Sequence, residues 1–315
     1  MLAELRSEIP AERTGAVLVD LHDGLADPGA AVVEDRVSLP FVVVGLTHGA
    51  VDDRWLELCD VTVDAGDAAL DRIAQNITDH PITATTLALL LRGQHHLSVG
   101  EGLVAESAAY SVLQSGPEFS AWRGAHVARA LGDGGPRVRV APDDDVLSIT
   151  LTRPDRLNAL DAAMRDGLVE AFTLAAAAPD IAKVELRGEG RAFCAGGDLD
   201  EFGSRSDPAT AHLIRLERSV GRAIFELDKP TVTYLHGACM GSGIELAAFT
   251  DWVVAAADTH IALPEIGLGL VPGAGGTVSL TRRIGRLRTA WLAFSGSTID
   301  AATARTWGLV DELEA

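Results

Sequence analysis

The residues of this sequence best suited to chemistry are two glycine-rich stretches and two glutamates. The first stretch, Arg-Ala-Phe-Cys-Ala-Gly-Gly-Asp, occupies 191–198, and the second, His-Gly-Ala-Cys-Met-Gly-Ser-Gly-Ile-Glu, occupies 236–245 and ends in Glu245. Glu265 follows shortly afterwards. Two backbone N–H groups that meet at one oxygen stabilise the enolate of a thioester, and carboxyl groups move the protons of such a reaction. The pattern therefore predicts enolate chemistry on an acyl thioester.

Gly197 and Ser242 are the candidate sources of the two backbone donors. Gly197 ends a glycine pair, where the missing Cβ lets a ligand approach the main chain closely. Ser242 lies where a helix is expected to begin, and free N–H groups at a helix start suit developing negative charge. Taken alone, the first stretch could also be an ordinary tight turn, and the second could use glycine only for close helix packing.

The two glutamates are candidate proton-transfer groups because of their apolar surroundings. Glu245 falls on the first turn of the expected helix, next to apolar residues 246–248, and Glu265 lies in the otherwise uncharged run 261–269. Buried acids are rare without a reason. The alternatives are a first-turn glutamate that complements the helix dipole, and a loop-end carboxylate exposed to water.

The charge balance limits the possible partners. Twenty-six Lys and Arg against 45 Asp and Glu give a formal net charge of −19. A field of that sign repels phosphate backbones and anionic lipid surfaces, so we expect neither a nucleic acid nor a membrane as partner. Local basic side chains and backbone N–H groups can still bind an anionic small molecule such as coenzyme A.

Cysteine usage and the amino terminus indicate a cytoplasmic protein. Cys59, Cys194 and Cys239 show neither a CxxC pair nor metal-ligand spacing, so the sequence predicts no metal site. The first ten residues carry acids where a signal peptide needs an apolar run, and no stretch has the length and hydrophobicity of a membrane span. The sequence also lacks a Gly-x-Ser-x-Gly elbow and a phosphate-binding Gly-Lys-Ser/Thr loop, which argues against hydrolases and kinases.

The elements that must position the candidate residues follow an α/β pattern. A cluster of glycines and a proline at 131–136 is the most plausible domain break. Before it, buried strands are expected at 15–20 and 40–44, and helical periodicity begins near 67. Residues 40–50 also faintly echo 230–238, with the spacing off by two. After the break, the pattern predicts strands at 146–151, 183–186, 231–235 and 252–256, and helices at 161–178, 242–250, 284–294 and 301–307.

These residues resemble the crotonase, or enoyl-CoA hydratase/isomerase, superfamily over about 144–313. Residues 153–160 look like the family's first CoA-contacting turn, and the two glycine-rich stretches look like its oxyanion-hole segments. The resemblance implies oxyanion donors at the N–H groups of Gly197 and of Ser242, a position where the family usually has glycine. It also implies that Glu245 and Glu265 flank the substrate double bond.

The resemblance further implies contacts with the CoA moiety of the substrate. An acidic protein needs local positive charge for the phosphates, and Arg137, Arg139 and Arg153 are as available from the sequence as the arginine of the matching turn. The residues implied to contact CoA are Arg156, Leu157, Ala195, Asp198, Leu199 and Gly273.

The order of segments departs from the plan of the family. The resemblance implies an α/β, crotonase-type ββα spiral over 140–315, with 1–135 as an amino-terminal region of short strands and then helices. Family members continue for some tens of residues past the segment matching 308–310, into helices that cover the acyl pocket. Residues 97–111, preceded by 73–92, resemble those helices. We therefore hypothesise a permuted arrangement in which the amino-terminal region supplies the helical layer.

The expected function is reversible hydration of a 2-enoyl-CoA to a 3-hydroxyacyl-CoA. Glu245 would activate the water that attacks Cβ, and Glu265 would deliver a proton to Cα. The resemblance implies an acyl-CoA substrate, no cofactor beyond its CoA moiety, and a homotrimer or dimer of trimers. Two alternatives stay open: an enoyl-CoA isomerase or another acyl-CoA enolate reaction, and a non-catalytic CoA-binding or assembly subunit.

Overall fold

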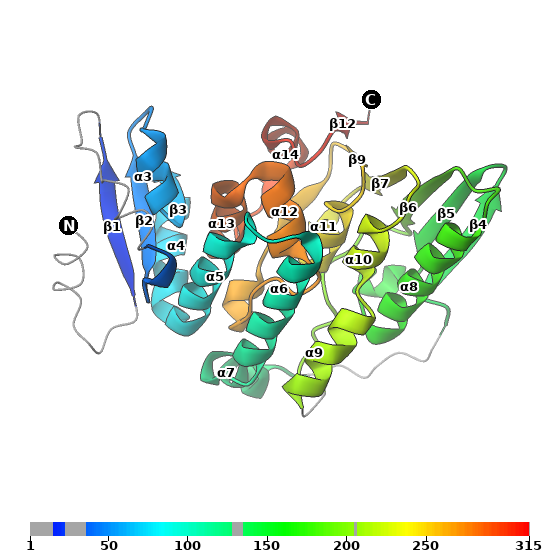
Figure 1. Ribbon diagram of the computed structural model, residues 1–315, viewed down its shortest axis with the longest axis horizontal. Helices are drawn as coiled ribbons and strands as arrows, with labels where there is room; N and C mark the ends of the chain where they lie inside the picture. Colours follow the sequence, from blue (N-terminus) through cyan, green and yellow to red (C-terminus); the bar gives the residue numbers. More distant parts are fainter. Residues whose placement is uncertain (1–14, 23–35, 128–134, 205–206, 315) are drawn as a thin grey trace.

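The computed structural model describes residues 15–22, 36–127, 135–204 and 207–314. Within these residues the chain forms three β-sheets surrounded by helices (Figure 1). The α/β architecture expected from the sequence is confirmed. The expected domain break at 131–136 lies mostly outside the described residues.

The largest sheet has six described strands in the order β12-β9-β7-β6-β5-β4. Neighbouring strands are parallel except β4 and β5, which pair antiparallel. Leu147, Ile149 and Leu151 alternate along β5 and are buried, as the two-residue period of a strand requires. The strands are β4 (Val138–Asp143), β5 (Val146–Leu151), β6 (Lys183–Gly188), β7 (Thr231–Leu235), β9 (Trp252–Ala255) and β12 (Glu312–Leu313).

A small sheet and a set of helices complete the carboxy-terminal region. The small sheet has the order β11-β10-β8. Its strands β8 and β10 end shortly before Ser242 and Glu265 in the sequence. Its strands are β8 (Ala238–Met240), β10 (His260–Ala262) and β11 (Ile299–Asp300). The described helices of this region are η2 (Pro154–Arg156), α8 (Ala162–Ala177), α9 (Pro208–Glu217), α10 (Val220–Phe225), α11 (Ser242–Ala247), η3 (Glu265–Leu268), α12 (Gly276–Ile284), α13 (Arg286–Ser295) and α14 (Ala301–Trp307).

The amino-terminal region forms a parallel sheet, β1-β2-β3, followed by helices. Pro81 begins α5 and Pro117 begins α7, positions at which the missing N–H of proline costs no helical hydrogen bond. The elements are β1 (Ala16–Leu21), η1 (Arg36–Ser38), β2 (Val42–Thr47), α3 (Asp53–Leu58), β3 (Val61–Asp64), α4 (Ala69–Asp79), α5 (Pro81–Gln94), α6 (Val99–Gln114) and α7 (Pro117–Ala125).

Helices of the amino-terminal region pack directly against the carboxy-terminal region. Figure 1 shows α4 to α7 between the three-stranded sheet and the six-stranded sheet. Helix α6 contacts α9 and α12, and α4 contacts α13. One continuous hydrophobic cluster includes Val42 and Ile73 from the first region and Ile149 and Leu280 from the second. The two regions therefore share a core.

Most expected elements of the carboxy-terminal region are confirmed, three of them, β5, β7 and α14, to the residue. The helix expected at 284–294 is α13, which begins two residues later. Helix α12 was not expected, because the glycine-rich residues 273–276 that precede and begin it are typical of a loop. Gly285, with φ of +83°, separates α12 from α13.

The faint echo between 40–50 and 230–238 corresponds to a local structural similarity. In both places a short helix lies between two paired parallel strands, as in β2-α3-β3 and in β7-β8-α11-β9, where β8 of the small sheet comes before the helix. An aspartate precedes the second strand in each: Asp60 accepts the N–H of Val43 at 2.8 Å, and Asp251 accepts that of Thr231 at 2.8 Å. The same backbone geometry thus occurs in both sheets.

Asp60 also forms a buried ion pair with Arg92 of α5. The Arg92 guanidinium donates to both Asp60 oxygens, at 2.8 and 2.6 Å. It also donates to the carbonyls of Arg36, Leu39 and Phe41, at 2.8, 2.7 and 2.7 Å. This network fixes α5 to the three-stranded sheet.

We predict that Asp60→Asn destabilises the protein, because the guanidinium of Arg92 would stay buried without a counter-charge. The free energy of unfolding should fall by about 3–5 kcal/mol in urea denaturation. As a control, Arg139→Ala breaks the exposed pair of Arg139 with Glu189 and should cost at most about 1 kcal/mol. Equal losses in the two variants would contradict the assignment.

Candidate active site

The two glycine-rich stretches lie side by side. The N–H of Cys194 donates to Ala238 O at 3.2 Å, and the N–H of Met240 donates to Cys194 O at 3.0 Å. A Cβ on Gly243 would lie 2.4 Å from Cys194 O, so this glycine is needed for close packing. The alternative interpretation of glycine as a packing residue therefore holds for Gly243.

Gly197 and Ser242 both line one cavity of about 250 Å³. The N–H of Leu160 donates to Gly196 O at 2.8 Å and that of Asp198 donates to Leu160 O at 2.9 Å, so the Gly197 N–H takes no part in this ladder. Ser242 begins α11, and the N–H of a first helical residue has no acceptor within its own helix. Both backbone donors are thus available at the cavity wall.

Glu245 lines the same cavity and is 2% exposed. Its Oε2 accepts the N–H groups of Ala274 and Gly276 at 2.7 and 2.8 Å. Burial raises the pKa of Glu245 to about 7, although the loop N–H groups oppose that rise. At neutral pH this carboxyl is close to the midpoint of its titration, which suits a general base.

Glu265 is the second carboxyl of the cavity and is 8% exposed. Among the described residues, its Oε2 has no hydrogen-bond partner. Burial, and then the neighbouring charge of Glu245, raise the pKa of Glu265 well above its ordinary value. A buried carboxyl with no donor on one oxygen is more stable with a proton than as a bare carboxylate, which suits a general acid. A Cβ on Gly241 would lie 2.3 Å from Glu265 Oε1, so glycine at 241 leaves room for the carboxyl.

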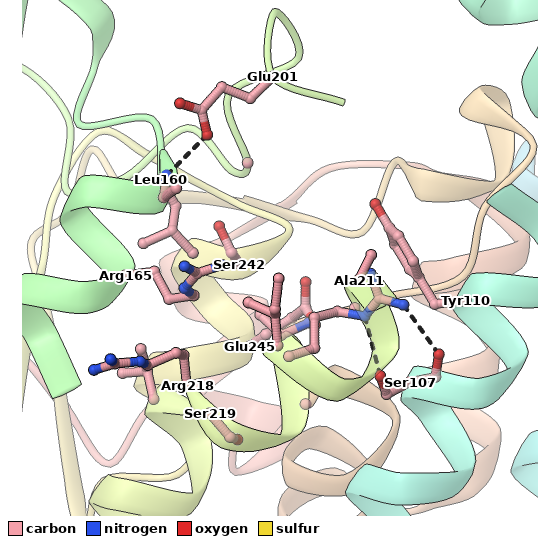
Figure 2. Close-up of a pocket in the computed structure, with 18 of the residues that line it drawn as sticks. Ser107, Tyr110, Leu160, Arg165, Glu201, Ala211, Arg218, Ser219, Ser242 and Glu245 are labelled. Carbon is pink, nitrogen blue, oxygen red and sulfur yellow. Dashed lines mark hydrogen bonds between the residues drawn. The ribbon is translucent and has the colours of Figure 1, made fainter. Parts of the chain in front are cut away.

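Helix α6 of the amino-terminal region contributes a third buried carboxyl, Glu106, which the sequence analysis missed. Glu106 is 2% exposed and lines the cavity with Ser107 and Tyr110. Figure 2 shows Ser107 and Tyr110 on one side of Glu245 and Ser219 on the other. A signal was present: Glu106 is three residues after Leu103 and four before Tyr110, on the apolar face of the helix.

The remaining predicted site residues divide into two groups. Asp198 and Gly273 line the cavity, and a Cβ on Gly273 would lie 2.6 Å from the Tyr110 ring. Four others lie outside the set of described residues that line it; they are Arg156, Leu157, Ala195 and Leu199.

Arg156 and Leu157 lie in the turn at 153–160 itself. Leu157 adopts a left-handed φ of +52° and its carbonyl accepts the N–H of Ala195 at 2.9 Å. Arg156 pairs with Asp200 at 3.0 Å, and Leu199 is 38% exposed. Their contact with CoA stays a prediction.

The expectation that Arg153 is available for phosphates is wrong. Arg153 is 3% exposed and pairs with Asp198 at 2.6 Å and with Asp161 at 3.4 Å. Arg137 also pairs with Asp161, at 2.8 Å. The shorter pair of Arg153 joins it to Asp198 in another segment, so no local pattern could show that Arg153 is used inside the fold.

The described residues contain neither a candidate metal site nor a helix that could span a membrane. His, Cys, Asp and Glu side chains there form no group of three suited to hold a metal ion, the carboxyls of the cavity included. Within the same residues, every helix is too short or too polar to cross a lipid bilayer.

The fold and the cavity together define an α/β protein with a carboxyl-lined, glycine-walled site, and comparison with known proteins gives its family. Residues 142–315, more than half of the chain, match the model of the Enoyl-CoA hydratase/isomerase family. The chain belongs to this family, and the resemblance to the crotonase superfamily is confirmed.

Two curated relatives illustrate the range of the family. A mevalonyl-coenzyme A hydratase of Beauveria bassiana is 34% identical over 180 residues, 55% of this chain and 64% of the relative. The 2,3-dehydroadipyl-CoA hydratase of Escherichia coli is 36% identical over 174 residues, 55% of this chain and 68% of the relative. The chain thus spans about two thirds of the length of these relatives.

Solved structures confirm the crotonase-type fold. An enoyl-CoA hydratase from Thermoplasma volcanium GSS1 superposes with a TM-score of 0.54 and 36% sequence identity. The match covers 57% of this chain and 72% of that structure.

The raised pKa of Glu245 predicts a pH dependence of stability. The ordinary pKa is 4.5 and the folded value is about 7, so between these values the folded state binds more protons than the unfolded state. Stability is then lost as the pH rises through this interval. Relative to Glu245→Gln, the wild type should lose about 1–3 kcal/mol between pH 5 and pH 8 in urea denaturation. A constant difference between the two proteins would contradict the raised pKa.

Proposed function

We propose that the protein catalyses the reversible addition of water to a 2-enoyl-CoA, giving a 3-hydroxyacyl-CoA. The observation that carries the proposal is the meeting of two buried carboxyls in one cavity: Glu245, whose Oε2 accepts two N–H groups, and Glu265, whose Oε2 has no partner among the described residues. The backbone donors of Gly197 and Ser242 at the same wall supply the place for the thioester oxygen.

In the proposed mechanism, Glu245 takes a proton from a water molecule as the oxygen of that water bonds to Cβ of the substrate. The electron pair of the double bond moves toward the thioester carbonyl, and the N–H groups of Gly197 and Ser242 hold the resulting enolate oxygen. Glu265 then gives its proton to Cα, and the carbonyl forms again. Proton exchange with solvent restores both carboxyls. The thioester is its own electron sink, so the chain's carboxyls and amides suffice.

We further propose that α5 and α6 take the place of the carboxy-terminal helices that cover the acyl pocket in other family members. This proposal is supported by the position of Leu103, Glu106 and Tyr110 of α6 in the cavity wall. The acyl chain would then lie between α6 and α9. Ala211 and Ile214 of α9 also line the cavity.

Replacing either proposed proton-transfer group should abolish most of the activity. Glu245→Gln and Glu265→Gln should each lower the rate of crotonyl-CoA hydration by about 10²-fold or more, because each removes a proton-transfer step. The rate is followed by loss of the absorbance of the conjugated enoyl thioester. Glu170→Gln, at an exposed position of α8, is the matched control and should keep the wild-type rate. Full activity of Glu245→Gln or of Glu265→Gln would show that the replaced glutamate is not a proton-transfer group.

The same assay separates the alternative functions. An isomerase would convert a 3-enoyl-CoA into the conjugated 2-enoyl-CoA and would depend on one of the two carboxyls only. A non-catalytic subunit would turn over neither substrate in the wild-type protein.

We also propose a homotrimer or a dimer of trimers. Helices α8, α9 and α10 leave Leu174, Leu213 and Phe225 53%, 65% and 57% exposed, and contact between subunits would remove such side chains from water. Multi-angle light scattering should give three or six times the chain mass of 33.0 kDa. The mass of a single chain at micromolar concentration would contradict this assembly.

A further inference from the structure

Four consecutive backbone N–H groups at the start of α12 alternate between two buried glutamates. Ala274 and Gly276 donate to Oε2 of Glu245 at 2.7 and 2.8 Å. Gly275 donates to Oε1 of Glu106 at 2.7 Å, and Thr277 donates to Oε2 of Glu106 at 2.8 Å. The N–H groups of successive residues therefore donate to different carboxyls. The φ of +106° at Gly275 permits this change in N–H direction from one residue to the next.

Glu106 is fully engaged in this arrangement. Besides the two N–H groups it accepts the Thr277 hydroxyl at 2.7 Å, and Gln94 of α5 donates to the same hydroxyl at 2.9 Å. No described side chain of the α12 amino terminus itself provides a cap, so Glu106 and Glu245 satisfy donors that would otherwise be left unpaired.

The segment 274–277 has little space in which to move. A Cβ on Gly276 would lie 2.5 Å from Glu245 Cγ, and a Cβ on Gly275 would lie 2.4 Å from the Phe249 ring. A shift of the segment therefore displaces the Glu245 side chain. Glu106 accepts the N–H groups of Gly275 and Thr277, which alternate with those bonded to Glu245. The contacts of Glu106 therefore help to set the position of the segment, and the segment in turn sets the position of Glu245 Oε2.

We propose that Glu106 is a positioning residue of the active site, acting on Glu245 through the segment 274–277. The amino-terminal region would thus supply part of the catalytic geometry, although Glu106 lies outside the residues that match the family model. The role in catalysis rests on the proposed function, but the mechanical coupling between the two carboxyls does not.

Glu106→Gln is the variant that tests the proposal. The amide of glutamine has one acceptor atom, so its NH₂ group faces the N–H of either Gly275 or Thr277, and one hydrogen bond is lost. Glu118→Gln is the matched control. Glu118 likewise accepts two N–H groups at a helix start, those of Ile82 and Thr83 at 2.8 and 2.9 Å, but it is not among the described residues that line the cavity.

Residue-resolved hydrogen exchange on the full chain measures the coupling without any assay of activity. In Glu106→Gln, at least one of the amides of Gly275 and Thr277 should exchange at least about tenfold faster, since one of the two loses its acceptor. The amides of Ala274 and Gly276, which are bonded to Glu245, should accelerate as well. Acceleration of Gly275 and Thr277 alone would overturn the proposal. Glu118→Gln should leave all four amides unchanged.

Steady-state kinetics with crotonyl-CoA then test the catalytic role. Glu106→Gln should lower kcat by about 10–100-fold with KM within about threefold of wild type, because a displaced base slows the chemical step. A kcat within twofold of wild type, or an equal loss in Glu118→Gln, would overturn the role. If Glu106→Gln does not fold, Thr277→Val removes the hydroxyl contacts with Glu106 and Gln94, keeps the backbone N–H of residue 277, and should give a smaller change in the same direction. A wild-type protein without hydratase activity would refute the proposed function and leave the exchange experiment to decide the coupling.

Discussion

The cost of burying carboxyl groups is the constraint on which the rest of the site depends. A carboxylate removed from water is stable only when hydrogen-bond donors replace its hydration or when it takes up a proton. Glu245 and Glu106 both accept N–H groups from 274–277. These donors oppose the effect of burial, which still raises the pKa of Glu245 to about 7 and, together with the nearby Glu245, that of Glu106 to about 8. Glu265, whose Oε2 lacks a partner among the described residues, has no such donor on that oxygen, and its pKa is raised well above the ordinary value. The three chemically identical side chains thus differ in the donors that replace their hydration.

Glycine at several positions is a consequence of this burial. Gly241 and Gly276 lie where a Cβ would collide with Glu265 and Glu245, at 2.3 and 2.5 Å. Side chains there would push the carboxyls out of the cavity, so the backbone must approach them closely. The same need for close approach brings Gly243 against Cys194 O. The glycine-rich stretches are therefore packing elements and donor sites together, and the two interpretations that the sequence left open do not exclude one another.

The sequence predicted those features that are determined by residues close together in the chain, and it missed those that depend on distant contacts. Strand β7 and helix α14 were predicted to the residue because hydrophobic periodicity is carried by neighbouring residues. Glu245 and Glu265 stood out because their own neighbours are uncharged. Glu106 was missed although it shares the apolar face of α6, since its partners are about 170 residues away in the chain.

Long-range contacts explain the other differences as well. Helix α12 begins without a described side-chain cap of its own. Glu106 of α6 and Glu245 of α11 accept its first N–H groups instead, so the residues just before α12 carry no cap signal that would have predicted the helix. Arg153 was one of several arginines that the sequence left equally available for phosphates, but it pairs with Asp198, which lies 45 residues further along the chain. The strand-helix-strand unit of the amino-terminal sheet shows what such differences mean for chemistry. In α3, the Asp52 side chain caps the helix by accepting the N–H of Arg54, whereas α11, which begins at Ser242 after Gly241, has no described side-chain cap. A helix between parallel strands is therefore capped by its own side chain in one sheet and uncapped beside the cavity in the other, so the difference that matters for chemistry lies in the loop before the helix and not in the strands.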